Sequence, residues 1–206
     1  MGLLDSLLGR TKPVRPNLDA LFALPTAAVT LQSAAGLVLS GRAGVCWMPP
    51  AGQSPADVQR EISELLDVPD DPAGGTGAAG GTGAAGPLTQ AEDSYGYRWL
   101  LLEDSDVGDL VSRVHLVNSL LSENGWGPQL LCSVFGVTPD AGADGSARPC
   151  YLVYLFKRGT FYPFAPLDKE SRDNELELRV RSLLGSDLPV EADLSRWFPL
   201  WDLPVR

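Results

Sequence analysis

The sequence contains few of the residues from which catalytic and metal sites are usually built. It has one histidine, His115, and three cysteines, Cys46, Cys132 and Cys150, with no CxxC spacing among them. A metal site needs several histidine, cysteine or carboxylate ligands at set spacings, and no such set is present. A GK[ST] phosphate loop and a GxSxG nucleophile motif are missing as well. The sequence therefore predicts a protein that is not an enzyme and that has no cofactor or metal.

Positive charge is also scarce. Sixteen lysines and arginines face 26 acidic residues, which gives a net charge of −10. A duplex-binding protein normally carries a basic stripe that meets the phosphates, whereas this sequence has only short basic clusters, so we expect no nucleic-acid partner. No apolar run approaches the ~20 residues needed to cross a bilayer. Residues 1–13 lack the features of a signal peptide, and we therefore expect a cytoplasmic protein.

The N-terminal segment leaves several interpretations open. Residues 1–25 hold two short helical patterns, the second of which is expected to end at Pro25, and four leucines would share one face of the first: Leu3, Leu4, Leu7 and Leu8. That face would be buried, would bind a groove of a partner, or would touch the inner face of a membrane peripherally. The pattern MGxxxS also matches a myristoylation signal. A buried helix is the favoured interpretation.

The patterns after residue 25 predict one α+β domain over 26–206. Strand-like segments lie at 27–31, 36–40, 43–48, 95–102, 129–137 and 150–157. Apolar stripes with capping residues predict helices at about 54–66, 105–124 and 169–184. Short connections and hairpins favour a two-layer, mostly antiparallel sheet with helices packed on one face.

Two further segments complete this organisation. The hexapeptide GTGAAG occurs twice in succession within 69–91, which predicts a flexible Gly/Ala-rich loop because such sequence cannot bury enough surface to offset its ordering entropy. The C-terminal tail is broken by prolines and carries Trp197, Phe198 and Trp201. Because these rings need cover, we expect the tail to pack back on the body of the domain.

The segment 151–166 is the candidate partner-binding site. It concentrates aromatic rings and positive charge in an otherwise acidic chain, and the alternation of its strand makes both faces apolar. Aromatic residues beside arginine are typical of interface anchors. The predicted contact residues are Lys157, Arg158, Phe161, Tyr162 and Phe164. As an exposed arginine, Arg158 is expected to contribute little to stability. The alternative is that Phe161 and Phe164 close the end of the core.

An uncharacterised enzyme is the competing functional hypothesis. It would pair His115 with one of the three thiols, or use the acids at Glu103/Asp104/Asp106 or at Glu170/Asp173. Each cysteine lies in a strand-like apolar stretch, which favours buried, reduced thiols. The first acidic group precedes a predicted helix, where carboxylates cap the helix N-terminus. Structural roles are therefore favoured for these residues.

Several stretches resemble the phage-shock-protein-A-associated proteins of high-GC bacteria, the AB type. They include GYRWLLLEDSD, NGWGPQLLCSVFG, KRGTFYPFAP and DLPVEADLSRWFP, and the likeness covers most of the chain outside 69–91 and 138–147. The resemblance implies a non-catalytic accessory or adaptor protein of the envelope-stress response. It also implies a protein partner, with the coiled-coil phage-shock protein A as the candidate.

Overall fold

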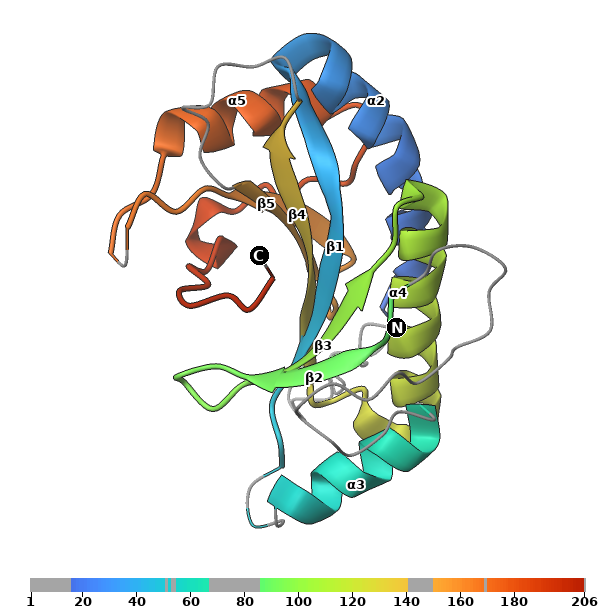
Figure 1. Ribbon diagram of the computed structural model, residues 1–206. Helices are drawn as coiled ribbons and strands as arrows, with labels where there is room; N and C mark the ends of the chain where they lie inside the picture. The colour runs from blue at the N-terminus through green and yellow to red at the C-terminus, as the bar shows by residue number, and fades with distance from the viewer. Residues whose placement is uncertain are drawn as a thin grey trace, which may run out of the picture.

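A six-stranded sheet forms the centre of the computed structural model (Figure 1). The structure describes residues 16–50, 52, 55–66, 86–140, 150–168 and 170–205. The strands lie in the order β2-β3-β1-β4-β5-β6, and each neighbouring pair is antiparallel. Their bounds are β1 Leu37–Trp47, β2 Thr89–Glu92, β3 Arg98–Glu103, β4 Leu130–Pro139, β5 Cys150–Leu155 and β6 Thr160–Phe164.

Helices cover one face of this sheet. Figure 1 shows α2 and α4 side by side along that face, and α5 packs against α2 and β6. The α-helices in the described part of the chain are α2 Leu24–Ala35, α3 Pro55–Leu66, α4 Val107–Leu121 and α5 Asn174–Leu184. Shorter helical turns are η1 Leu18–Ala23, η2 Ser122–Trp126 and η3 Leu194–Arg196. The sheet and its helical layer confirm the predicted α+β class.

The segment 27–31, expected as a strand, lies inside α2, so that prediction is wrong. Pro25 occupies the first turn of α2, where its missing N–H removes no intrahelical hydrogen bond. Pro25 therefore lies at the start of a helix, whereas it was expected to end one. Four residues at helical spacing are fully buried and form the face that packs on the core: Leu21, Leu24, Ala27 and Leu31. This long-range burial decides between helix and strand, which the apolar pattern alone left undecided.

The predicted strands 36–40 and 43–48 are two parts of the single strand β1. The register of β1 against β4 shifts between Leu39 and Ala43. Gly41 lies in this irregularity with φ 75, and a Cβ there would meet the carbonyl oxygen of Asp104 at 2.6 Å. A glycine is therefore required for the chain to bend at this point without leaving the sheet.

Both faces of the central strands are apolar. In β5, Leu152 and Tyr154 pack in the helix-side core, whereas Tyr151 and Val153 belong to a second core on the opposite face. This alternation confirms the predicted two-sided apolar strand. The second face therefore needs a cover of its own.

The C-terminal segment provides this cover. Trp197, Leu203 and Val205 are buried against the face that the helices leave open, and the Trp197 ring stacks on Tyr162 at 5.9 Å between centroids. Figure 1 shows this segment beside the sheet on the side away from α2 and α4. The tail packs back as predicted, but Phe198 stays 58% exposed.

Some boundaries differ from those expected. Residues 89–91, placed in the flexible loop, belong to β2, which pairs with β3. Of the acids Glu103, Asp104 and Asp106, it is Asp106 that caps α4, by accepting a hydrogen bond from the Asp109 amide at 2.9 Å. The remaining predictions for 1–15, for 69–85 and for 141–149 lie outside the described residues.

One described helical stretch, Leu18–Ala35, is long and apolar enough by composition to cross a membrane. Its fully buried leucines contact the domain core, and η1 and α2 pack against α4. The core helix of a folded domain meets the same criterion of length and composition, and the buried stripe of this stretch is typical of such a helix.

The helix phases make a prediction about stability. Val114 and Val180 are 0% and 1% exposed, whereas Leu178 is 48% exposed. We expect Val114→Ala and Val180→Ala each to lower the free energy of unfolding by about 1–3 kcal/mol, from lost burial and a residual cavity. Leu178→Ala is the control and should cost well under ~1 kcal/mol. Urea unfolding of the three variants measures these free energies. If Leu178→Ala lowered the free energy of unfolding as much as Val180→Ala, the face of α5 assigned to the core would be wrong.

Candidate partner-binding site

The two predicted basic residues lie in the turn between β5 and β6. Lys157 and Arg158 are exposed there, and the amide of Gly159 donates to the carbonyl of Leu155 at 2.9 Å. Gly159 has φ 68, and a Cβ on it would lie 2.9 Å from the Cβ of Asn17. A glycine is thus needed both for the left-handed turn and for the close approach of the chain that leads into η1.

The three predicted aromatic contact residues lie in the interior. Phe161, Tyr162 and Phe164 are 1%, 1% and 0% exposed. The expectation of an exposed aromatic platform is therefore wrong, and the alternative that the rings close the core is the one the burial supports. The physical reason is that β6 is covered on both faces, by α5 and η1 on one side and by the C-terminal tail on the other.

These rings organise the tail instead. The hydroxyl of Tyr162 donates to the carbonyl of Phe198 at 2.8 Å. Burial raises the pKa of Tyr162 above its ordinary value, so the hydroxyl keeps its proton for this bond. Phe164 packs edge-on against Trp201 at 5.3 Å. The aromatic residues of β6 thus hold the C-terminal segment against the sheet.

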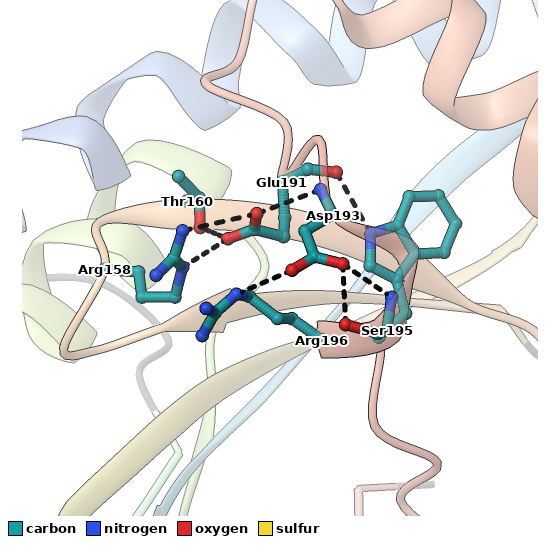
Figure 2. Close-up of polar contacts among 7 residues, drawn as sticks. Arg158, Thr160, Glu191, Asp193, Ser195 and Arg196 are labelled. Atoms are coloured by element: carbon teal, nitrogen blue, oxygen red, sulfur yellow. Dashed lines mark hydrogen bonds and ion pairs between the residues drawn. The ribbon is translucent and has the colours of Figure 1, made fainter.

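Arg158 has a partner in the tail that its sequence position did not indicate. Its guanidinium donates to the Glu191 carboxylate, with Nε 2.5 Å from Oε2, and the Thr160 hydroxyl donates to the same oxygen at 2.9 Å (Figure 2). Glu191 is only 3% exposed. A charge buried to this extent needs an opposite charge and hydrogen bonds, so Arg158 has a structural role. The structure thus contradicts the premise that Arg158 has no partner in the folded chain, and a larger contribution to stability is expected than the sequence predicted.

Next to this pair, the tail forms a second polar cluster. The Asp193 carboxylate accepts from the backbone amide and hydroxyl of Ser195 and from the Nε of Arg196, at 2.6–3.0 Å (Figure 2). The Trp197 indole N–H donates to the Glu191 carbonyl at 3.1 Å. These bonds fold the tail into η3 and leave Leu194 51% exposed beside Arg196. Both are surface residues that the sequence analysis did not select.

The electrostatics of Glu191 follow from these contacts. Burial by itself would raise the pKa of its carboxyl, but hydrogen bonds from Arg158, the Asp193 amide and Thr160 outweigh this effect and hold the pKa below its ordinary value. Glu191 is therefore ionised at neutral pH, and the turn between β5 and β6 is tied to the tail by an ion pair.

No hydrogen bond joins His115 to any of the three thiols in the described part of the chain. Cys46 and Cys132 lie in the tail-side core, whereas His115 lies on α4 with its ring 4.8 Å from that of Phe22 and its Nε2 3.6 Å from Asp19. Cys150 is buried in the helix-side core, and burial raises its pKa to about 12. The cysteines are thus buried, as predicted.

The acidic groups have structural partners. Asp106 caps α4, and Asp173 caps α5 by accepting from the Leu176 amide at 3.0 Å. Asp104 accepts from the Asp106 amide and lies 3.6 Å from Arg113. Helix capping, which the sequence favoured for the first group, accounts for Asp106 and Asp173, whereas Asp104 is paired with Arg113.

The comparisons with known proteins give one match. A family model described as PspAB, PspA associated protein B, matches residues 1–205. No curated protein and no solved structure matches the chain.

The buried carboxylate predicts a pH-dependent effect of Arg158. Arg158→Gln should lower the free energy of unfolding by about 1–2 kcal/mol at pH 7, a value reduced because the arginine is partly exposed. Since the pKa of Glu191 is depressed in the folded state, this contribution is present above the ordinary carboxyl pKa and is lost as the pH falls below about 4. Arg196→Gln, in an exposed pair, is the control and should be nearly neutral. Urea unfolding at pH 7 and at a pH below about 4 measures this contribution. If Arg158→Gln were as stable as the parent at pH 7, the predicted role of the ion pair would be contradicted.

Proposed function

The chain belongs to the PspA-associated protein B family, and we propose that it serves the phage-shock system as a non-catalytic accessory protein that binds PspA. The observation that carries this proposal is the family match over residues 1–205, which confirms the resemblance seen in the sequence. The family name suggests an accessory role in that system and association with PspA. The proposal places the protein in the cytoplasm, with at most peripheral contact with the inner face of the membrane.

The surface around the turn between β5 and β6 supports a specific mode of binding. Lys157 and Arg158 are exposed on the turn. Arg196 adds a third cation from η3, because the acidic partners of the two arginines, Glu191 and Asp193, are two residues apart in the tail. Leu194 supplies exposed apolar area beside them. We call these four residues, Lys157, Arg158, Leu194 and Arg196, the basic turn patch.

An acidic helical partner fits the basic turn patch. The chain as a whole carries a net charge of −10, and this patch brings three cations together, two of which are paired with Glu191 and Asp193, so a negatively charged partner is repelled less here than the net charge implies. Arginines bind carboxylates through forked hydrogen bonds, and a leucine between them offers a contact that excludes water. The buried rings of β6 contribute by fixing the turn and the tail, and they do not touch the partner.

The first experiment tests the proposed function itself. Purified chain is titrated against purified PspA by calorimetry at low and at physiological salt. Saturable binding that weakens with added salt is expected, because charges at the rim of an interface are screened. Absence of binding at any salt concentration, with folded proteins, would overturn the assignment of PspA as the direct partner.

The second experiment tests the basic turn patch. Arg196→Glu should weaken PspA binding by about 1–3 kcal/mol because it reverses a charge at the interface. Its melting temperature should stay near that of the parent, since the Arg196–Asp193 pair is exposed. Arg60→Glu is a matched control, because Arg60 is also an exposed arginine paired with an aspartate three residues away, but on α3. Equal effects of the two variants would show that the patch is not the interface.

A further inference from the structure

A cavity lies on the tail side of the sheet, between the β2–β3 hairpin and the C-terminal segment. Its volume is about 480 Å3, which is within the range of small-molecule sites. The hairpin and the tail form its opposite walls, and Cys46 and Cys132 lie in its floor. Figure 1 shows the tip of the hairpin reaching out below the C-terminal segment on this side. The tail therefore covers the sheet incompletely and leaves a partly open space over β1 and β4.

Aromatic rings dominate the walls of this cavity. Six of the thirteen lining residues are aromatic: Tyr95, Tyr97, Trp99, Tyr162, Phe198 and Trp201. Tyr95 and Phe198 are 59% and 58% exposed, so they stand at the rim and meet solvent when the cavity is empty. A partly open space lined by rings is suited to a ligand that gains from contact with π-faces.

The charged residues around the cavity are of one sign. Asp93 lines it, and an adjoining cavity of about 410 Å3, which shares Tyr95, Leu200 and Trp201, is lined by Asp168 and Asp202. No lysine, arginine or histidine lines either cavity within the described part of the chain. The ring faces and the carboxylates that line the two cavities thus each favour a positively charged ligand.

Asp93 is held rigidly with its charge uncompensated. Its carboxylate accepts hydrogen bonds from the Tyr95 and Tyr97 amides and from the Trp99 indole N–H, at 2.9–3.0 Å. These donors are neutral, and no described cation forms an ion pair with it. The hairpin thus fixes a negative charge at the wall without neutralising it.

From this arrangement we infer that the aromatic cavity is a binding site for an organic cation, an ammonium or guanidinium group carried on an apolar body. The apolar body would fill the space between hairpin and tail, where burial of apolar area is favourable. The cationic group would lie against the rings and near the carboxylates, because a ring face attracts a cation and the low polarity of the walls strengthens that attraction. The cavity shares no lining residue with the basic turn patch and takes a ligand of the opposite charge.

Binding is tested on the full chain with choline and with its neutral carbon analogue, 3,3-dimethylbutan-1-ol. The two molecules have nearly the same shape and differ in charge, so their comparison isolates the contribution of the cation. Trp99 and Trp201 line the cavity, and their fluorescence reports occupancy. Choline should bind at least about tenfold more tightly than the neutral analogue. N-acetyl-arginine amide, as a second probe, distinguishes a guanidinium site from an ammonium site.

Two pairs of variants locate the bound cation. Phe198→Leu removes an exposed ring from the rim, and Phe22→Leu removes an exposed ring on the helix side as its control. Asp202→Asn removes a charge beside the cavity at a residue with φ 63, a conformation that asparagine tolerates, and Asp19→Asn is the control on η1. The first member of each pair should weaken choline binding several-fold with an unchanged melting temperature, and its control should not.

Three results would overturn the inference. Equal binding of choline and the neutral analogue would show an apolar cavity without preference for a cation. Equal effects of a variant and its control would place the ligand elsewhere. No binding of either cationic probe at millimolar concentration, with the parent protein folded, would show that the cavity is not a cation site.

Discussion

The central strands of this protein carry apolar side chains on both faces, and each face must be removed from water. Helices α2, α4 and α5 cover one face, and the C-terminal segment covers the other. Burial of apolar area is the main favourable term in folding, so a sheet of this kind cannot be stable with one layer of helices alone. The chain end is therefore a structural layer, and its attachment determines the shape of the tail-side surface.

Polar contacts determine where the tail lies. Glu177, 2% exposed, accepts from the Ala165 amide and from Arg172, and Arg172 donates to the Trp197 carbonyl at 2.6 Å. The Arg158–Glu191 pair fastens the other end of the same segment. Because both carboxylates are buried, loss of either arginine would leave an uncompensated charge. These two pairs place η3 beside the turn and leave a space between the tail and the hairpin.

The basic turn patch and the aromatic cavity both follow from the way the tail is attached to the sheet. The ion pair at Glu191 brings a cation of the turn and a cation of η3 to a common surface, while the incomplete cover over β1 and β4 leaves the cavity. The family name suggests an accessory role in the phage-shock system, and the two proposed surfaces differ in charge, so each would take a partner of the opposite charge.

The sequence by itself determined the elements whose signals are local. The apolar stripe of α4, the pairing of β4 with β5 and the two-sided apolar character of β5 all follow from periodicity and turn residues within short windows. Tertiary structure alone decided that 24–35 is helical, because its apolar pattern fits either conformation until one face is buried. It also decided that the rings of β6 are interior and that Arg158 is paired with Glu191, 33 residues away. Exposure and ion pairing depend on what covers a residue, and that cover comes from segments distant in the chain.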